Sequence, residues 1–353
     1  MRYPALIVNK EKLTKNIEVM QKICDDYPVG FCAVTNGFCA NPEIIDIYYE
    51  AGVREFADSR IQNLKKIKYP DVTKWLLRLP MLSEVEEVVQ NADVSLNSEL
   101  RTIVALSECA AALDKTHKII LMVDLGDLRE GALPKEARRL AETILQCPNI
   151  ELYGLGANFD SISGLQADAA NVGVLADLAN DILIRTGIAP PVLSGGGSGS
   201  AHLLTRFEVP GFVNNFRFGE VLLFGRETKY HQRIDSMNED VFRLDMQIVE
   251  LKNKPRTLSE EFDLNKYDTE IVFDETKHMT RAIVACGHQD AKAVSIKPLD
   301  PGIEIVGQSD DHTVLDVTGS EWEYHVGDII RFSLSYDSLL SLSASEYVYK
   351  KCE

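Results

Sequence analysis

Residues 119–145 read IILMVDLGDLREGALPKEARRLAETIL and contain the repeating unit of the fold. An apolar run comes first (residues 119–124), a polar turn follows, and an amphipathic stretch (residues 135–145) ends the unit. A strand that is apolar without alternation is typical of a parallel sheet buried on both faces. The amphipathic stretch has the pattern of a helix that covers such a sheet. The stretch therefore predicts one strand–helix unit of an α/β fold.

The same unit recurs between residue 30 and about residue 225. Further apolar runs occupy residues 30–35, 55–58, 75–79, 94–96, 152–157, 192–194 and 215–217, and further helix patterns occupy residues 42–51 and 83–89. Eight such units in about 200 residues favour a closed (β/α)8 barrel of the TIM type. A doubly wound open sheet is the alternative, but no G-x-G-x-x-G turn follows the first strand to support it.

The pattern changes after residue 225. Runs rich in β-branched residues are separated by turns such as NKP and PLDPG, with no long helix between them; they occupy residues 241–251, 270–273, 282–286, 303–306, 313–317 and 329–334. This pattern predicts a mostly antiparallel β domain. We therefore expect a barrel domain over residues 1–230 and a C-terminal β domain over residues 231–353. Residues 1–10 are a candidate to pack with the second domain.

Composition excludes several classes of function. The chain has 353 residues, with 37 Lys and Arg against 54 Asp and Glu, so its formal charge is −17. This charge repels phosphate backbones and anionic lipid, so we expect no nucleic acid and no membrane as partners. No apolar run approaches the ~20 residues of a membrane-spanning helix. The seven cysteines are scattered without C-x-x-C spacing, which predicts reduced thiols in the cytoplasm and no metal site.

The active site of a (β/α)8 barrel lies where the strands end, so the residues that follow each strand are the candidates. Residues 194–200, SGGGSGS, follow a predicted strand and precede a helix-like stretch. Glycines permit close backbone approach, and exposed amides with serine hydroxyls at a helix start favour a phosphate. The loop predicts a phosphate site, and a flexible turn is the alternative.

Two arginines also lie at predicted strand ends, Arg129 in VDLGDLREG and Arg217 in NNFRFGEVLLFGRE. An arginine in a barrel mouth must be paired or bound to an anion or a ring, because burying it unpaired is costly. A structural ion pair, for instance with Asp124 or Glu130, is the simpler interpretation of each arginine alone.

Several motifs in fixed order resemble the alanine racemase superfamily, with the ornithine racemases as the most similar subgroup. They are AVT-x-x-FCANPE, ADSRIQNLKK, LLRLPM-x-SEVEEVV, VDLGDLREG, SGGGSGS, R-x-G-x-x-LL-x-GRET and a late SYDSLL, and they run nearly from end to end of the chain. The resemblance implies pyridoxal phosphate as cofactor and a barrel followed by a C-terminal β domain.

The resemblance also implies roles for individual residues. Arg217 is similar to the arginine that hydrogen-bonds the pyridine nitrogen, and a guanidinium can only donate. Arg129 is similar to the residue near the phenolic oxygen of the cofactor. Asn158 lies where the family has a polar residue inside the mouth, and a cap at the strand end is its alternative role. The phosphate would be held by Ser194, Gly195, Gly196, Gly197, Ser198 and Tyr336.

One position departs from the family pattern. The Schiff-base lysine belongs directly after AVT, and this chain has Asn36 there. An amide forms no covalent link to the cofactor and takes no proton from Cα near neutral pH. Lys65 and Lys66 have no motif that assigns them the role. Three explanations stay open: an engineered Lys-to-Asn knockout, a natural member with altered or lost activity, or a substitute lysine elsewhere.

Racemisation needs a second base on the opposite face of Cα. In the family this base comes from the β domain of the partner subunit, which implies a homodimer with shared sites. Here the corresponding segment reads AIVACGHQD and places His288 at that point, and an imidazole exchanges protons near neutral pH. In VGQSDDHTVLDV, Asp311 matches a second cross-subunit segment, and Asp310 is a candidate partner for a substrate ammonium. An exposed turn is the alternative for all three.

The resemblance therefore implies a pyridoxal-phosphate-dependent amino-acid racemase that acts on a basic amino acid such as ornithine by two-base proton transfer. Asn36 puts the activity of this chain in question. A non-catalytic protein that binds pyridoxal phosphate or an amino acid is the alternative from another class, and a decarboxylase of the same fold is the third reading.

Overall fold

The computed structural model describes residues 2–257, 273–274 and 276–353. Its internal contacts divide the chain into two compact units. One unit is Lys10–Val241, and the other joins residues 2–9 to Phe242–Glu353. The sequence placed this boundary at residues 230/231, whereas the contacts place it after Val241.

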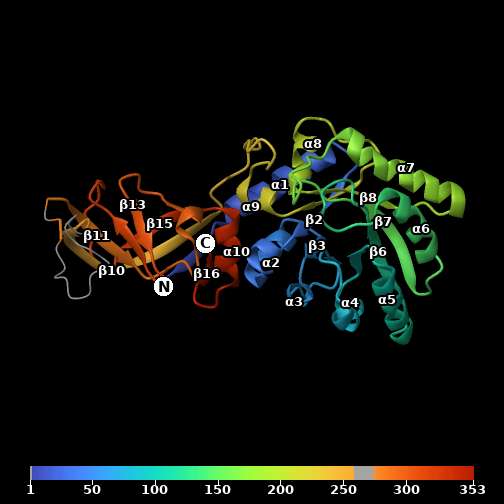
Figure 1. The fold of residues 1–353 in the computed structure, drawn as a ribbon, viewed down its shortest axis with the longest axis horizontal. Coiled ribbons are helices and arrows are strands. Elements are labelled where there is room, and N and C mark those ends of the chain that lie inside the picture. The colour runs from blue at the N-terminus through green and yellow to red at the C-terminus, as the bar shows by residue number, and fades with distance from the viewer. Residues whose placement is uncertain (1, 258–272, 275) are drawn as a thin grey trace, which may run out of the picture. The chain divides into compact units, whose positions relative to one another are not determined.

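The first unit is a closed barrel of parallel strands, as predicted (Figure 1). Each strand pairs with the next along the chain, and the last pairs with the first through Cys32 and Arg217. The open doubly wound sheet is therefore wrong, because such a sheet leaves two unpaired edges. The strands are β2 (Gly30–Val34), β3 (Glu55–Asp58), β4 (Thr73–Leu76), β5 (Val94–Asn97), β6 (His117–Met122), β7 (Ile150–Gly156), β8 (Val192–Gly197) and β9 (Asn215–Phe218).

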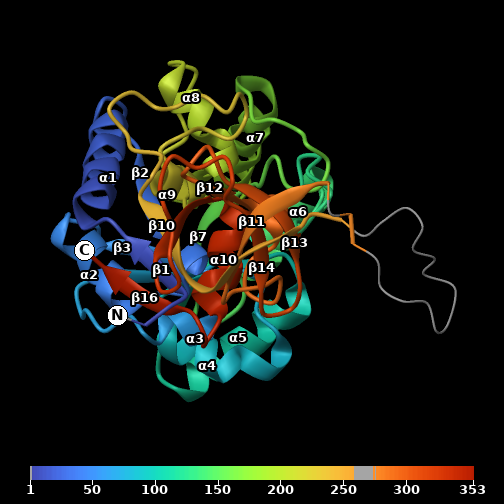
Figure 2. The same cartoon turned by 90° about the vertical axis from the view of Figure 1, so that its left-hand side faces the viewer.

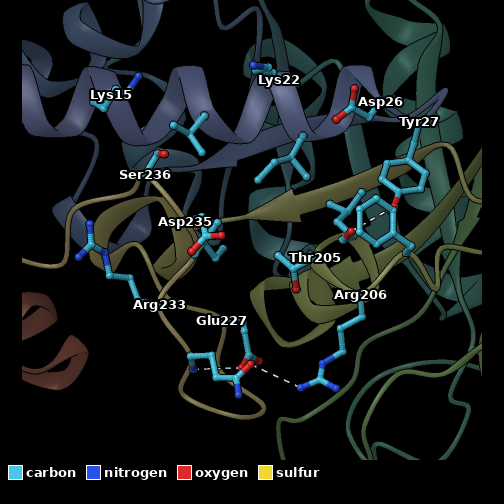
Figure 3. Close-up of a pocket in the computed structure, with 16 residues that line it drawn as sticks. Lys15, Lys22, Asp26, Tyr27, Thr205, Arg206, Glu227, Arg233, Asp235 and Ser236 are labelled. Atoms are coloured by element: carbon cyan, nitrogen blue, oxygen red, sulfur yellow. Dashed lines mark hydrogen bonds between the residues drawn. The ribbon is translucent and has the colours of Figure 1, made fainter.

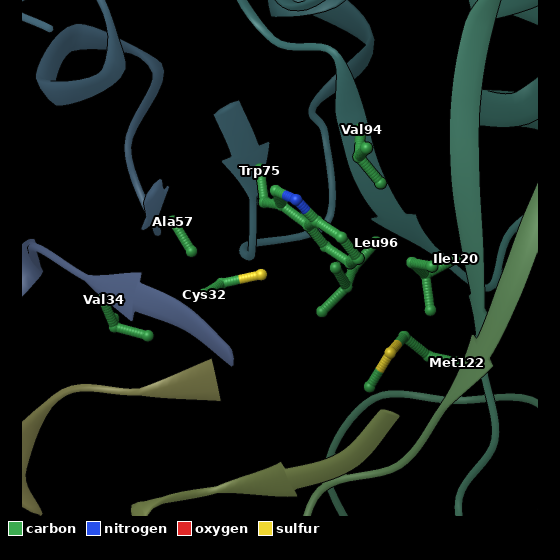
Figure 4. Packing of buried hydrophobic residues seen from close by; sticks show 8 residues of the cluster. All are labelled: Cys32, Val34, Ala57, Trp75, Val94, Leu96, Ile120 and Met122. Carbon is green, nitrogen blue, oxygen red and sulfur yellow. The ribbon is translucent and has the colours of Figure 1, made fainter. Parts of the chain in front are cut away.

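Apolar side chains fill the barrel interior, and Figure 4 shows how they converge. Trp75, Leu96 and Ile120 are buried, and the sulfur atoms of Cys32 and Met122 turn toward the same space. The interior of such a barrel is a packed core and not a pore, so polar residues find room only near the strand ends. This packing confines the candidate chemistry to one end of the barrel.

Helices follow the strands and cover the outside of the barrel (Figure 1). Two of them show why the chain turns where it does. Asn41 caps the start of α2 with Pro42 in its first turn, and Asp168 and Asn171 form a capping box at the start of α7. The helices are α1 (Lys10–Asp25), α2 (Pro42–Glu50), α3 (Ile61–Leu64), α4 (Val85–Asn91), α5 (Leu100–Ala112), α6 (Pro134–Ile144), α7 (Ala169–Thr186), α8 (Ala201–Thr205) and α9 (Glu220–Phe224), with short 3-10 turns η1 (Asn36–Phe38), η2 (Leu82–Glu84) and η3 (Ser198–Ser200).

The second unit is built on a mostly antiparallel sheet, again as predicted (Figure 2). The long strand β10 pairs with β1 and β15 in its first half and with β11 in its second half. β1 is also parallel to β16, so the two ends of the described chain lie side by side. The elements are β1 (Ala5–Val8), β10 (Phe242–Pro255), β11 (His278–Val284), η4 (Ala293–Ser295), β12 (Ile296–Pro298), β13 (Glu304–Gln308), β14 (Thr313–Asp316), β15 (Ile329–Leu334), α10 (Tyr336–Ala344) and β16 (Tyr349–Cys352).

Some predicted elements differ from those found. The strand expected at residues 75–79 is β4, which begins earlier and ends at Leu76. The β domain contains the nine-residue helix α10, which the sequence reading missed. The strand predicted at residues 270–273 lies, except for residue 273, outside the described residues. Within the described ranges, no helix is long and apolar enough to cross a membrane.

Candidate active site at the barrel mouth

The ends of five barrel strands carry residues that the sequence singled out. Arg217 lies in β9 and Ser194 in β8, whereas Asn158 follows β7 and Arg129 lies in the loop after β6. Asn36 is the first residue of η1 and is separated from the end of β2 by Thr35 alone. Because all the strands are parallel, these positions meet at the carboxyl end of the barrel, where barrel enzymes have their active sites.

Arg217 is buried, with 4% of its surface exposed. Its Nη2 donates to the carbonyl of Ala157 at 2.6 Å and to Oδ1 of Asn158 at 2.9 Å, and its Nη1 lies 3.8 Å from the sulfur of Met122. Gly156 provides the room, because a Cβ there would lie 3.3 Å from Nη1 of Arg217. Burial lowers the pKa of the guanidinium to about 10, so it stays protonated near neutral pH.

A hydrogen-bonded chain joins Arg217 to the second predicted arginine. Asn158 accepts from Arg217 and donates from Nδ2 to Oε1 of Glu130 at 2.7 Å. Glu130 in turn pairs with both Nε and Nη2 of Arg129, the latter at 2.8 Å. Arg129 also donates to the hydroxyl of Ser161 at 3.1 Å. The ion pair that the sequence offered as the simpler interpretation of Arg129 exists, and it is part of the same network as Arg217.

The glycines of the predicted phosphate loop are needed for close packing. Gly196 has a φ of +110°, and a Cβ there would lie 2.4 Å from Oγ of Ser200. A Cβ at Gly195 would lie 2.9 Å from a neighbouring aromatic ring, and one at Gly197 would lie 3.2 Å from the carbonyl oxygen of Arg217. The loop is therefore a tightly packed turn whose backbone lies beside Arg217.

The serines of this loop differ in their surroundings. Ser194 is completely buried and donates to Oδ1 of Asn215 at 2.8 Å. Ser198 is half-buried, and its hydroxyl accepts from the backbone N–H groups of Gly219 and Val221, both at 3.2 Å. These amides begin α9. Sequence reasoning did not connect them with the loop, although Gly219 directly before the helix-like EVLLF could have indicated this helix start.

The loop fits a phosphate group. In the part of the chain that the structure describes, the buried hydroxyl of Ser200 has no hydrogen-bond partner. A buried hydroxyl is rarely left in this state without a ligand or water to bind it. The glycines of the loop allow close approach, and the hydroxyl of Ser198 is already held by the amides at the start of α9. These features match the chemistry of phosphate recognition by backbone amides.

The segment around Asn36 is anchored by a buried carboxylate. Asp58, at the end of β3, is completely buried and accepts from Oγ1 of Thr35 at 2.6 Å and from the backbone N–H of Arg60 at 2.8 Å. Burial raises the pKa of Asp58, and these hydrogen bonds partly oppose that change. Asp58 thus fixes Thr35, the residue that precedes Asn36. The backbone at position 36 is therefore attached to a rigid part of the barrel.

The two lysines weighed as substitutes for a lysine at position 36 have other partners. Lys65 forms an ion pair with Glu87 at 2.5 Å. Lys66 donates to Oδ1 of Asn63 at 2.9 Å and to the carbonyl of Cys39 at 2.7 Å. Lys66 therefore supports the turn that follows Asn36, which is a structural role.

In the second unit, the structure brings His288 and Asp310 together. Nε2 of His288 lies 2.9 Å from Oδ1 of Asp310. The two turns are joined by a hydrogen bond from the backbone N–H of His288 to the carbonyl of Ser309 at 2.9 Å. Gly287 permits this approach, since a Cβ there would lie 2.1 Å from the carbonyl oxygen of Asp310. The sequence reading assigned Asp310 to a substrate ammonium and did not pair it with His288. Asp311, next to it, is exposed.

Tyr336 is the first residue of α10, also in the second unit. Ser335 caps this helix and fixes where it begins. The tyrosine is half-buried. Its predicted contact with a cofactor phosphate stays a prediction.

A separate groove of about 600 Å³ lies against α1 and α8 (Figure 3). Its lining has charges of both signs, including Lys22, Arg206, Glu227 and Asp235. None of the predicted site residues lines it. Among the described residues, no group of three or more His, Cys, Asp or Glu side chains could hold a metal ion.

Comparison with known proteins agrees with this arrangement. The chain is 41% identical to the ornithine racemase of Acetoanaerobium sticklandii over 352 residues, which cover 99% of both chains. It is 30% identical to the lysine racemase of Thermotoga maritima over 355 residues, which cover 100% of this chain and 99% of that protein.

Solved structures show the same fold. The alanine racemase of Clostridium difficile 630 matches with a TM-score of 0.77 at 16% identity, covering 100% of this chain and 96% of that one. The alanine racemase of Bartonella henselae, solved with covalently bound pyridoxal phosphate, matches with a TM-score of 0.75 at 16% identity and covers 100% of both chains. The family described as alanine racemase, N-terminal domain, matches residues 8–227. With the barrel, the β unit and the sequence relatives in agreement, the chain belongs to the alanine racemase family.

Proposed function

We propose that this chain is built as a pyridoxal-phosphate-dependent amino-acid racemase for a basic amino acid such as ornithine. The observation that supports it most is the identity with an ornithine racemase over 99% of both chains. The barrel mouth supports the cofactor: Arg129 and Arg217 lie in one hydrogen-bonded network, and Arg217 lies beside the loop 194–200. The scattered cysteines support a cytoplasmic location, which stays a prediction.

Different residues of the mouth would bind different parts of the cofactor. The loop 194–200, including the hydroxyl of Ser200, would hold the phosphate, with Tyr336 as a further predicted contact. Arg217 would donate to the pyridine nitrogen, and Arg129 would lie near the phenolic oxygen. When bound, pyridoxal phosphate supplies an electron-withdrawing ring that makes the α-proton of an amino acid more acidic. Because a guanidinium only donates, Arg217 would keep that ring less electron-withdrawing than a protonated pyridine.

Two-base racemisation also requires a proton carrier on each face of Cα. We assign one face to position 36 and the other to His288 of a partner subunit, so the active unit is a homodimer that completes each site from two chains. His288 is exposed within its own unit, as expected of a group that serves a second chain. Asp311 belongs to the same proposed contribution.

Asn36 determines what the chain does as it stands. Its amide neither binds the cofactor covalently nor accepts a proton near neutral pH. We therefore propose that this sequence binds pyridoxal phosphate noncovalently and racemises amino acids poorly or not at all. A non-catalytic binding protein is the second candidate function, and Asn36 is the observation that favours it.

The substitution Asn36→Lys separates the two candidates. A general base contributes roughly 10²–10⁴-fold to a proton transfer, so we expect at least a hundredfold gain in solvent deuterium incorporation at Cα of L-ornithine. L-lysine, L-alanine and L-serine are measured beside it to define the substrate class. Asn36→Arg is the matched control, because it adds a cation that cannot act as a base or a nucleophile. If Asn36→Lys attaches the cofactor covalently and no amino acid exchanges its proton, the binding-protein function replaces the racemase.

A further inference from the structure

The carboxylate of Glu130 contacts both sides of the barrel-mouth network. Its side chain is 18% exposed. One face pairs with Nε and Nη2 of Arg129, and Oε1 also accepts from Nδ2 of Asn158 at 2.7 Å. Paired hydrogen bonds between a guanidinium and a carboxylate fix the plane of the arginine as well as its position. Glu130 thus orients Arg129 directly.

Asn158 passes this orientation on to Arg217. A carboxylate can only accept and a guanidinium can only donate, so the amide between them has one possible polarity. Its NH2 group must face Glu130 and its oxygen must face Arg217, as found in the structure. A change at Glu130 therefore releases the amide, and with it one of the bonds that hold the buried guanidinium of Arg217.

The charges of Arg129, Arg217 and Glu130 also support a role of Glu130 in holding the two arginines together. Two guanidinium groups in one barrel mouth repel each other, and a carboxylate between them offsets that repulsion. Burial is the largest influence and lowers the pKa of Arg217; Cys32 and the charge of Glu130 act to raise it, and the charge of Arg129 acts to lower it. Glu130 is the carboxylate among these groups, and it also pairs with Arg129.

We propose that Glu130 is a positioning residue that holds Arg129 and Arg217 together as a preformed pair for the ring end of the cofactor. The proposal rests on the proposed function for the identity of that cofactor. The phosphate loop is held by separate contacts, which do not include Glu130. Glu130 should therefore affect recognition of the ring and not of the phosphate.

The first experiment needs no cofactor. With 15N-arginine labelling, the guanidinium N–H signals of Arg129 and Arg217 are followed by NMR in the unliganded protein. Glu130→Ala should shift and broaden both sets, whereas Asn158→Ala should disturb Arg217 and leave Arg129 in place. Glu136→Gln, an exposed carboxylate on α6, is the matched control for loss of one charge in this region. Undisturbed Arg217 signals in Glu130→Ala would overturn the proposal.

The second experiment measures binding to the protein with Asn36 in place. Pyridoxal phosphate should bind Glu130→Gln about tenfold more weakly, as expected for loss of a charge-assisted hydrogen bond, and inorganic phosphate should bind equally well to both proteins. Equal loss for both ligands would show that Glu130 supports the loop as a whole and would contradict the proposal. If the unmutated protein does not bind pyridoxal phosphate, the proposed function fails, while the NMR result still decides the role of Glu130 in placing the arginines.

Discussion

The barrel mouth and the turns around His288 differ in how their candidate groups are held. Arg217 is 4% exposed and has several partners inside one unit. His288 and Asp310 form one ion pair on side chains that are 54% and 75% exposed. A buried group with several hydrogen bonds has little freedom, whereas an exposed pair is screened by water and contributes little to stability.

This difference is consistent with the proposed assembly of the site from two chains. The barrel can prepare a cofactor site from its own residues, because its cations already have their partners. The charged groups of the β unit are exposed to water. Their interaction with a ligand would become strong only if another surface excluded that water. If His288 completes the site of a second chain, as proposed, a change in the barrel should act within one chain and a change at His288 should act through the partner.

The largest effect is expected when chains with different defects are mixed. The sequence as it stands lacks a base at position 36, and the double variant Asn36→Lys/His288→Ala lacks the second base. Each alone should exchange the α-proton of ornithine at least a hundredfold more slowly than Asn36→Lys. If sites are shared across a twofold dimer, half of the randomly mixed dimers have one complete site of two, so about a quarter of the Asn36→Lys rate should return.

Subunit exchange must be verified for this test, for example by native mass spectrometry of chains of different mass. Mixed dimers without recovered exchange would show that His288 serves its own chain or no reaction. The comparison between the two regions would then concern stability alone.

A second prediction concerns a buried histidine of the barrel. His117 is 1% exposed, lies 2.7 Å from Oγ of Ser95 through Nε2, and has its pKa lowered to about 4, first by burial and then by the charge of Lys115. The unfolded chain binds this proton near pH 6.5 and the folded chain does not. The stabilisation is therefore complete above pH 6.5 and is lost as the pH falls toward 4, at a total cost of roughly 3 kcal/mol.

Urea unfolding at pH 7 and at pH 4.5, compared between the unmutated protein and His117→Gln, measures this contribution. The carboxylates titrate equally in both proteins, so the difference between the two pH dependences isolates the histidine. The variant should lose less stability on acidification than the unmutated protein. Parallel pH dependences would mean that His117 is solvated and that this part of the barrel wall admits water, contrary to the 1% exposure of the side chain.

The smallest effect is expected at Asp310. Asp310→Asn removes an exposed ion pair, so the free energy of unfolding should change by less than about 1 kcal/mol. The imidazole 15N signals of His288 should nevertheless move, because Asp310 favours the proton on Nε2. Asp311→Asn removes the adjacent charge and should leave these signals in place. Equal spectra for Asp310→Asn and the unmutated protein would show that the pair does not persist in solution.

The sequence predicted the barrel because each strand is a continuous apolar run followed by a polar turn. The short strand β16 could not be found in this way: its residues YKKC have no apolar run, and its partner β1 lies at the other end of the chain. The helix α10 was missed because SYDSLL was read only as a family motif, although Ser335 is a capping residue at its start. Short elements depend on tertiary partners more than on local pattern.

The sequence predicted which residue types form the candidate site. It did not predict the hydrogen bonds and ion pairs between them. Arg217 and Arg129 could be located from strand ends, but their link through Asn158 depends on the register of β6, β7 and β9 around the barrel. The contact between His288 and Asp310 depends on how two turns of the sheet approach each other at Gly287. Distances between side chains on separate elements leave no mark in sequence spacing.

The strand β1 has a consequence for biosynthesis. Its residues Ala5–Val8 are entirely buried, and both of its neighbours, β10 and β16, are made only after the whole barrel. From Val241 to Glu353 there are 353 − 241 = 112 further residues, which take about 6–22 s to translate at 5–20 residues per second. During that time the apolar strand β1 has neither of its partner strands, although the barrel that follows it in the chain can already fold. Nascent chains should therefore be most prone to aggregation and to chaperone capture in this interval, and a stall late in translation should be more harmful to this protein than one within the barrel.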